Sequence, residues 1–359
     1  MMKVAHIIKS LDTGGVETWL KDLSYITEDK LDFILHNNSA SYYEDEVKEN
    51  SAKITRIPLR LGMLTFSKKL YNHFKKESFD VVHSHVNLAS GWMLFIAWLA
   101  GVPIRVAHCH NDKRSEYKTH SFSKKLYYFF AKVLVNLFSN KKIAVSKDCA
   151  PSMFYSSSKV NILPCGLNLI AKDNKLSRSE LGLQNDDIVL AHVGRFVPQK
   201  NHLFLLDLMT LLKSESNFKL LLIGDGKGYT EVEEIIGKRN LTNIKLLGVR
   251  SDVKELMKYT ADFFLLPSKF EGLGLVAVES QSNNLFTLVA DTVPKDVKIS
   301  DFLEFLPIDK ASTWKERLLE LTASKEHIKA KRLPFDNRKF SIEENYRQLT
   351  VIYSGSKAL

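Results

Sequence analysis

The chain of 359 residues contains few cysteines: Cys109, Cys149 and Cys165, without a Cys-x-x-Cys spacing. An odd number without paired spacing supports neither a disulfide framework nor a zinc site. Low cysteine content is typical of a reducing compartment, and we expect a cytoplasmic location. The first eleven residues also lack an extended apolar segment, which argues against a signal peptide.

Long hydrophobic runs are lacking as well. The most apolar stretch, residues 91–102 (GWMLFIAWLAGV), is shorter than the roughly 20 residues that a membrane span needs, so we expect a buried helix. Residues 123–138 (SKKLYYFFAKVLVNLF) combine lysines with a dense aromatic and aliphatic stripe. Such a helix can lie in a membrane interface or bury the stripe within its own domain, and both interpretations stay open.

Acidic residues are scarce in one part of the chain. The formal net charge is +10, from 51 Lys and Arg against 41 Asp and Glu. Between Lys53 and Lys147 there are 17 basic and only 4 acidic residues. This imbalance is typical of a protein that meets a membrane surface, a phosphorylated substrate or nucleic acid. A solvated basic surface without a partner is the other interpretation.

Apolar strands alternate with helical patterns along the chain. In the first half, strands are expected at residues 4–8, 33–36, 54–57 and 81–83. After a polar segment at 166–178, strands are expected at residues 188–194, 220–224, 244–247 and 261–266. This alternation predicts two α/β domains, each a parallel sheet with helices on both faces. Ligands bind such sheets beyond the carboxyl ends of the strands.

Residues 267–279 (PSKFEGLGLVAVE) join an expected strand to an apolar helical stretch that begins at Leu275. Gly272 and Gly274 allow the backbone to come close to a ligand. The helix N-terminus adds unpaired N–H groups and the positive end of the helix dipole. Together these features suit an anionic group.

Glu271 and Glu279 bracket this turn, and we interpret them as carboxylates that grip different hydroxyls of one extended ligand. Two unrelated acids, one on the surface and one on a helix face, are the structural alternative. The spacing Glu271-x7-Glu279 after a buried strand resembles the signature of retaining glycosyltransferase family 4. Other motifs of that family follow in order: Gly14-Gly15 before Glu17, His110 at the end of a strand, and Arg195 with Lys200 after the strand at 188–194.

The resemblance covers nearly the whole chain. Residues 10–20 (SLDTGGVETWL) and 289–301 (VADTVPKDVKISD) resemble the capsule and exopolysaccharide branch of the family in particular. The family has the GT-B fold, in which two Rossmann-like α/β domains with parallel sheets face each other across a cleft. This implies an acceptor-side N-terminal domain at 1–168 and a nucleotide-sugar-binding domain at 169–339. The last helix, at about 340–355, is expected to pack back onto the first domain.

The resemblance implies four catalytic residues: Arg195, Lys200, His110 and Glu271. Arg195 and Lys200 would grip the donor diphosphate, and an arginine fork and a mobile lysine charge do suit a departing diphosphate. His110 would contact the sugar. His108 lies on the same face by strand period, so the choice between the two histidines stays open. Glu271 would hold a sugar hydroxyl.

Other residues would bind the rest of the donor. The resemblance assigns the ribose hydroxyls to Glu279 and the base to the backbone at Val249 and Arg250. Gly15 would present backbone N–H groups to the phosphates or to the acceptor. Further backbone amides would come from Gly272, Leu273, Gly274 and Leu275.

The sequence contains no Asp-x-Asp triad. Because arginine and lysine can replace a cation, we expect neither a metal nor another cofactor. No residue is an evident covalent nucleophile, and the family's retaining chemistry is commonly drawn as front-face attack. One departure from the family is residues 281–285 (QSNNL), where it usually has a small residue, glycine and proline. Asn283-Asn284 can end the preceding helix instead.

The resemblance therefore predicts a hexosyl- or N-acetylhexosaminyltransferase. It would move a sugar from a nucleotide sugar, taken as a UDP-sugar, to a glycan or lipid-diphosphate-linked acceptor in capsule or exopolysaccharide synthesis. The expected partners are this donor, this acceptor and an anionic membrane surface, at whose inner face the protein would sit peripherally. Nucleic acid is not an expected partner.

Three alternative functions have less support in the sequence. An NAD-dependent oxidoreductase depends on GDGKG at Gly224, which lacks the full Gly-x-Gly-x-x-Gly pattern and its acid. A basic nucleic-acid-binding module lacks RNP, zinc and helix-turn-helix patterns. A non-catalytic scaffold would not need Arg195, Lys200, Glu271 and Glu279 all to be present.

Overall fold

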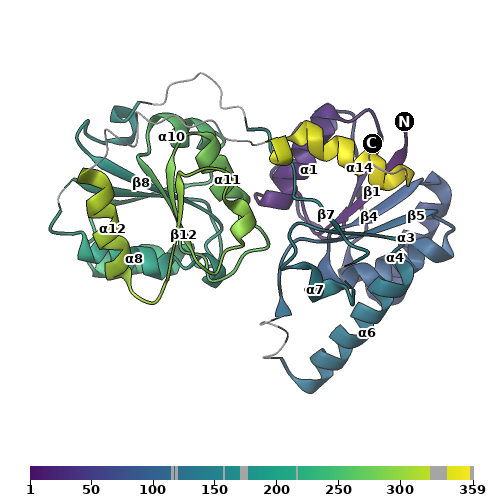
Figure 1. The fold of residues 1–359 in the computed structure, drawn as a ribbon. Helices are drawn as coiled ribbons and strands as arrows, with labels where there is room; N and C mark the ends of the chain where they lie inside the picture. The colour runs from purple at the N-terminus through teal and green to yellow at the C-terminus, as the bar shows by residue number, and fades with distance from the viewer. Residues whose placement is uncertain are drawn as a thin grey trace. The chain divides into compact units, whose positions relative to one another are not determined.

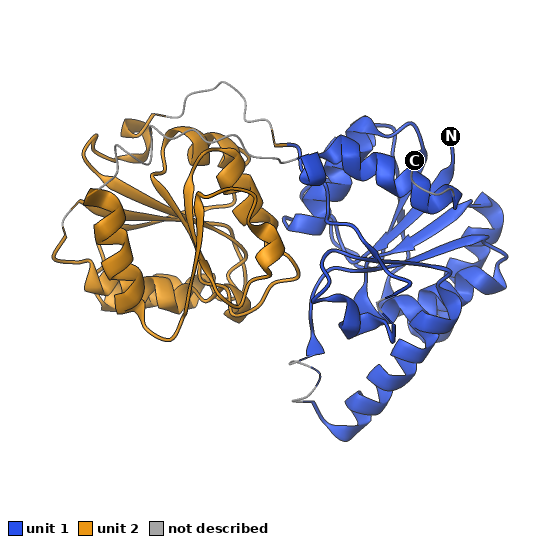
Figure 2. Cartoon of the chain, in the orientation of Figure 1, with its two compact units in different colours: residues 1–168, 338–359 blue, residues 169–337 orange. Residues whose placement is uncertain are grey.

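The computed structural model describes residues 1–114, 117, 120–156, 158–169, 177–215, 217–323 and 338–355. The chain divides into two compact units, coloured separately in Figure 2: unit 1 is Met1–Asn168 with Arg338–Leu359, and unit 2 is Leu169–Asn337. Each unit is an α/β domain built on its own parallel sheet. The predicted architecture of two Rossmann-like domains is confirmed.

The sheet of unit 1 has strand order β3-β2-β1-β4-β5-β6-β7, and every described pair is parallel. Its strands are β1 (Lys3–Ile8), β2 (Lys30–Leu35), β3 (Lys53–Arg56), β4 (Val81–Ser84), β5 (Ile104–Cys109), β6 (Lys141–Ala144) and β7 (Asn161–Ile162). The central strands β1 and β4 are almost wholly buried, as expected for parallel strands covered on both faces, and their polar residues His6, His83 and Ser84 are buried too.

Helices cover both faces of this sheet (Figure 1). They are α1 (Gly15–Ile26), α2 (Glu44–Glu49), α3 (Met63–Glu77), α4 (Ser90–Leu99), α6 (Phe122–Phe138), α7 (Ala150–Met153) and α14 (Ile342–Ser354), with the short helices η1 (Leu59–Leu61), η2 (Asn87–Ala89) and η6 (Arg338–Phe340). α14 packs against α1 although the two are far apart in sequence, while α3 and α6 both pack against α4.

The contact between α1 and α14 is specific. Nε1 of Trp19 donates to Oδ1 of Asn345 at 2.8 Å, and Nδ2 of Asn345 donates to the carbonyl oxygen of Pro164 at 2.6 Å. Both side chains are fully buried. A buried amide with both of its ends bonded fixes the end of the chain to unit 1.

The expected buried helix at 91–102 is confirmed as α4, apart from its exposed end at Trp98 and Leu99. A Cβ on Gly91 would lie 2.7 Å from backbone atoms of α6, so glycine permits the close approach of the two helices. In α6, by contrast, only Ala131 and Val135 are buried. None of the helices in the described ranges is both long and apolar enough to span a bilayer.

The sheet of unit 2 has strand order β10-β9-β8-β11-β12-β13 and is also parallel. Its strands are β8 (Ile188–Val193), β9 (Phe218–Ile223), β10 (Ile244–Gly248), β11 (Phe263–Leu266), β12 (Phe286–Ala290) and β13 (Leu303–Leu306). Its helices are α8 (His202–Leu211), α9 (Tyr229–Lys238), α10 (Val253–Tyr259), α11 (Leu275–Ser282) and α12 (Ala311–Ala323), with η3 (Ser179–Leu181), η4 (Pro198–Lys200) and η5 (Lys295–Val297). Trp314 and Phe204 join α12 to α8 in its core, with ring centroids 5.2 Å apart.

Residues 281–285, where the sequence departs from the family it resembles, end α11 and contact the segment after η5. α11 ends at Ser282 and Asn284 takes a left-handed φ of +58°, as predicted for an asparagine that ends a helix. Gln281 is buried and its Nε2 donates to the carbonyl oxygen of Val297 at 2.9 Å. Its Oε1 accepts from the backbone N–H groups of residues 299 and 300, each at 3.1 Å. Gln281 therefore fixes the segment after η5 to α11.

Candidate functional site

Two loops lie at the carboxyl edge of the unit 2 sheet. They follow β8 and β11, which pair in parallel at the centre of the sheet. Residues 194–201 contain Arg195 and Lys200, and residues 267–274 contain Glu271. Ligands of α/β sheets bind at this edge, where neighbouring loops supply the contacts. These loops are therefore the candidate site of unit 2.

An ion pair joins the two loops. Nζ of Lys200 lies 2.6 Å from Oε1 of Glu271, and the side chains are 16% and 8% exposed. Nε2 of Gln199 donates to Oε2 of Glu271 at 3.2 Å and to the carbonyl oxygen of Phe270 at 2.9 Å, and the backbone N–H of Lys269 donates to the carbonyl oxygen of Gln199 at 2.8 Å. The sequence motifs do not identify Gln199. Its position next to Lys200 in the sequence is the only signal that could have identified it.

Glycines pack the loop after β8 against the loop after β9. Gly224 has a φ of +132°, and a Cβ on it would overlap the carbonyl oxygen of Gly194. A Cβ on Gly226 would lie 2.7 Å from the carbonyl oxygen of Phe196, whose own N–H donates to the carbonyl oxygen of Asp225 at 2.9 Å. The GDGKG sequence thus permits close backbone packing, which accounts for the motif that favoured an oxidoreductase.

The helix that follows Glu271 begins where the sequence predicts. Gly274 has a left-handed φ of +95°, and Leu275 is the first residue of α11. Gly272 and Leu273 are buried beside this turn. The N–H of Ala277 donates to the carbonyl oxygen of Gly274 at 2.9 Å, while the N–H groups before it have no carbonyl one turn back in the helix, so this end of α11 favours an anion. Glu279 is partly exposed and lies one turn further along.

The remaining predicted donor residues differ in their surroundings. Arg195 is exposed, and within the described ranges its guanidinium forms no ion pair. Arg250 binds both carboxylate oxygens of Asp252, at 2.7 and 2.6 Å. These hydrogen bonds raise the pKa of Arg250 and lower the pKa of Asp252. Val249, after β10, is 38% exposed, so its backbone lies near the surface.

Gly15 begins α1 after the loop 9–14 that follows β1, at the carboxyl edge of the unit 1 sheet. A Cβ on Gly14 would overlap Oε2 of Glu17. The carboxylate of Glu17 therefore folds back over the glycine turn. A phosphate that binds the backbone N–H of Gly15 has to displace this carboxylate or tolerate its negative charge.

Five histidines gather at the same edge of unit 1: His6 on β1, His83 on β4, His85 after β4, His108 on β5 and His110 after β5. All five are buried, and burial lowers the pKa of each imidazole, to about 3 for His6 and His110. They are therefore neutral at neutral pH. The edge of Trp19 packs on this cluster, with ring centroids 5.4 Å from His108 and 5.5 Å from His85.

Three of these imidazoles form what we call the first histidine row. Nδ1 of His6 lies 3.0 Å from Nε2 of His85, and Nδ1 of His85 lies 2.9 Å from Nε2 of His110. Nδ1 of His110 lies 3.6 Å from Sγ of Cys165, which is also buried. Both ring nitrogens of His110 therefore have a partner inside unit 1.

The other two imidazoles form the second histidine row. The hydroxyl of Tyr353 lies 2.7 Å from Nδ1 of His83, whose Nε2 lies 3.1 Å from Nδ1 of His108. Among the residues that the structure describes, none hydrogen-bonds to Nε2 of His108. The rings of His108 and His110 lie with centroids 4.0 Å apart, but only His110 keeps an exposed fraction, of 7%. His110 is thus the more accessible of the two.

The histidines also lie close enough to hold a metal. Ring nitrogens of His6, His83 and His85 lie within 4.8 Å of one another, as do those of His85, His108 and His110. Neutral imidazole suits zinc, copper and nickel. However, both groups need His85, whose two ring nitrogens already take part in the first histidine row. The arrangement fits hydrogen bonds between imidazoles better than a metal site.

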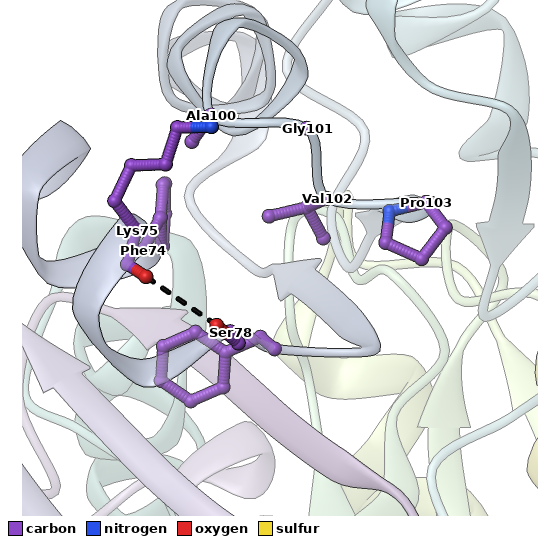
Figure 3. A pocket seen from close by; sticks show the side chains of 8 residues that line it. Phe74, Lys75, Ser78, Ala100, Gly101, Val102 and Pro103 are labelled. Atoms are coloured by element: carbon purple, nitrogen blue, oxygen red, sulfur yellow. Dashed lines mark hydrogen bonds between the residues drawn. The ribbon is translucent and has the colours of Figure 1, made fainter.

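A separate pocket of about 280 Å³ lies at the other edge of unit 1 (Figure 3). It is lined by Phe74, Lys75, Ser78, Phe79, Ala100, Gly101, Val102 and Pro103. These residues precede β4 and β5, so the pocket is at the amino ends of the strands. It is not part of either carboxyl-edge site.

Family models match both units. The model of glycosyl transferases group 1 matches residues 173–326, and the model of glycosyltransferase family 4 matches residues 13–169. The chain is 31% identical over 317 residues to the putative glycosyltransferase EpsF of Bacillus subtilis, covering 82% of this chain and 80% of that protein.

Two further relatives have more specific names. One is the capsular polysaccharide biosynthesis glycosyltransferase CapH of Staphylococcus aureus, 25% identical over 98% of this chain and 99% of that protein. The other is the UDP-Gal:alpha-D-GlcNAc-diphosphoundecaprenol alpha-1,3-galactosyltransferase of Escherichia coli, 25% identical over 81% of this chain and 79% of that protein.

The fold is similar to that of Anabaena HepE in complex with UDP-glucose. The TM-score is 0.81 at 18% identity, and the match covers 99% of this chain and all of that chain. This likeness confirms the GT-B fold that the sequence motifs predict.

Proposed function

The chain belongs to glycosyltransferase family 4, and on that basis we propose that it transfers a sugar from a UDP-sugar to a lipid-diphosphate-linked glycan in capsule or exopolysaccharide synthesis. The observation that carries this proposal is the pairing of Lys200 with Glu271 beside the N-terminus of α11. A cation, a carboxylate and the N–H groups at a helix N-terminus together suit a sugar joined to a diphosphate.

In this proposal the departing diphosphate is stabilised by Arg195, Lys200 and the N–H groups of residues 272–275. Negative charge grows on the leaving group as the bond to the sugar breaks, and fixed positive charge then contributes more than in the ground state. Lys200 is held in place by Glu271, whereas Arg195 is free to turn toward a bound donor. These two cations supply the charge that a metal would otherwise provide, so we expect transfer without a metal.

The other donor contacts follow the same edge of unit 2. Glu271 holds a sugar hydroxyl with the carboxylate lone pairs that Lys200 and Gln199 leave unused, and Glu279 accepts from the ribose hydroxyls. The backbone at Val249 and Arg250 meets the base. The choice of UDP as the nucleotide of the donor is supported by the UDP-glucose complex of HepE and by the UDP-Gal donor in the name of the Escherichia coli relative.

On unit 1 we propose that His110 contacts a sugar hydroxyl and that Gly15 contributes N–H groups to the acceptor or the phosphates. The acceptor class is supported by the diphosphoundecaprenol in the name of the Escherichia coli relative, and the capsule setting by the name of CapH. Retention of the anomeric configuration follows the chemistry of the family.

We also propose that α6 attaches unit 1 to an anionic membrane surface. Its exposed large side chains are Phe122, Leu126, Tyr127, Phe129, Phe130 and Leu137. Lys124 and Lys125 are exposed on the same helix and can meet anionic headgroups. Lys132 is different, because its Nζ donates to the carbonyl oxygen of Pro151 at 2.7 Å.

The reaction class can be tested by NMR of the transfer reaction in a buffer that contains EDTA. We expect UDP release and a product whose anomeric proton has the same configuration as in the donor. An inverted product, or transfer that stops with EDTA and returns with magnesium, contradicts the proposal.

A further inference from the structure

The first histidine row contains only neutral rings. Burial keeps the pKa of His6, His85 and His110 well below the ordinary value of a histidine. A neutral imidazole has one N–H donor and one lone pair. Each contact along the row therefore needs a donor on one ring and a lone pair on the next. Only two arrangements satisfy every contact: all three protons on Nε2, or all three on Nδ1.

Cys165, at the end of the row, decides between the two arrangements. Its pKa is raised by burial and by the nearby carboxylate of Glu17, so the side chain is a thiol rather than a thiolate. A thiol is a weak donor and a weak acceptor, and it bonds best to a good acceptor such as the lone pair of an imidazole. The contact at 3.6 Å thus fits an S–H donor that points at Nδ1 of His110.

We propose that His85 and His6 are positioning residues that hold His110 as the Nε2–H tautomer, which leaves the Nδ1 lone pair to accept a hydrogen bond from a sugar hydroxyl. The sugar contact rests on the proposed function, whereas the tautomer does not. Nε2–H of His110 donates to His85, and Nε2–H of His85 donates to His6.

Nδ1 is the ring nitrogen of His110 at which a ligand can replace the present hydrogen-bond partner. The partner of Nε2 is an imidazole at 2.9 Å, while the partner of Nδ1 is a thiol at 3.6 Å. A sugar hydroxyl is a stronger donor than the thiol and can replace it. His110 follows the end of β5 at the carboxyl edge, where the ligands of such sheets bind.

The tautomer can be read without any substrate, from long-range proton–nitrogen NMR spectra of the full chain with isotope-labelled histidine. We expect one neutral Nε2–H tautomer for His110 in the wild-type protein. His6→Phe removes the last acceptor of the row, so His110 should divide between two tautomers. His6→Asn places an amide oxygen where Nδ1 was and should restore the single tautomer. Tyr353→Phe disturbs only the second histidine row and should leave His110 unchanged.

The Nδ1–H tautomer in the wild-type protein, or an unchanged tautomer in His6→Phe, overturns the proposal. If His6→Phe does not fold, His85→Phe, which removes the lone pair that accepts from Nε2–H of His110, replaces it. Activity should scale with the fraction of molecules in which His110 is the Nε2–H tautomer. Equal populations of the two tautomers in His6→Phe should therefore lower kcat/KM about twofold, and His6→Asn should restore it. If the tautomers behave as expected but His110→Ala transfers sugar normally, the sugar contact is wrong and the row still positions His110.

Discussion

Nζ of Lys200 and Oε1 of Glu271 lie 2.6 Å apart, on loops that follow two neighbouring strands. The sequence motifs assign these residues to different parts of the donor, the diphosphate and the sugar. In the structure they form one unit together with Gln199, which bonds to the other carboxylate oxygen at 3.2 Å. The lysine is therefore oriented before a diphosphate binds, as preorganised stabilisation of a leaving group requires.

We expect Lys200→Ala and Arg195→Ala to reduce turnover more than donor affinity. Loss of one group that stabilises developing charge costs on the order of 10²-fold in kcat. Steady-state kinetics at saturating donor measures this loss. Lys269→Ala is the matched control, because that lysine on the neighbouring loop is exposed and its contact with Gln199 is made by its backbone N–H, which the substitution keeps. Normal turnover in Lys200→Ala would contradict the role of Lys200 in stabilising the leaving diphosphate.

The two glutamates should have separable effects. Glu279→Gln should weaken binding of free UDP, because the carboxylate accepts from ribose in the ground state as well as in the transition state. Glu271→Gln loses the ion pair with Lys200 and should lower sugar transfer more than UDP affinity. Calorimetry with UDP separates the two variants. Equal UDP affinity in the wild type and in Glu279→Gln refutes the ribose contact.

Asn345→Ala should destabilise unit 1. The substitution leaves two buried groups without partners, the indole N–H of Trp19 and the carbonyl oxygen of Pro164. Each buried unsatisfied group costs about 1–3 kcal/mol in the free energy of unfolding. Thr350→Ala, at an exposed position of α14, is the control for urea unfolding. Equal unfolding midpoints for both variants would show that the bond from α1 to α14 contributes little.

Acid should weaken unit 1 through its buried histidines. In the unfolded chain a histidine takes up a proton near pH 6.5, whereas in the folded state His6 and His110 have a pKa of about 3. Their stabilising effect is thus complete above pH 6.5 and is lost as the pH falls below it, by about 1.4 kcal/mol per pH unit for each histidine. Urea unfolding over this range should show a smaller slope for His6→Asn. Stability that does not change below pH 6.5 would contradict the buried neutral state.

Attachment to a membrane is tested by flotation with anionic and with neutral vesicles. Replacement of both Lys124 and Lys125 by glutamate should reduce recovery with anionic vesicles, since each basic residue near such a surface contributes about 1 kcal/mol. Glutamate at Lys213 and Lys310, two exposed positions of unit 2, is the matched control. Equal recovery with both lipids would leave the exposed stripe of α6 without a membrane role.

Much of the fold could be predicted from the sequence, because its signals are local. Apolar runs separated by turns locate β1 to β4 and β8 to β11, and Gly274 locates the start of α11, whereas β12 and β13 were not predicted. The exposure of α6 could not be predicted, because an aromatic stripe looks the same whether a neighbouring helix covers it or not. Only the packing against α4 shows that Ala131 and Val135 face inward and Phe129 outward.

The sequence motifs name candidate residues for the site, but they do not give the contacts between those residues. Spacing identifies Lys200 and Glu271 separately, but only the parallel pairing of β8 and β11 brings them together. Gln199 and the first histidine row carry no motif of their own, since partners such as His6 and His85 are 79 residues apart in sequence. Contacts of this range depend on strand order, which local patterns do not determine.

The most direct test of the central claim is mass spectrometry of the products from a panel of nucleotide sugars and lipid-diphosphate acceptors, with the wild type and Lys200→Ala side by side. We expect the wild type to add one sugar from a UDP-sugar to a lipid-diphosphate acceptor, and the variant to give at most a trace of that product. No transfer from any UDP-sugar, or equal product from Lys200→Ala, would contradict the account.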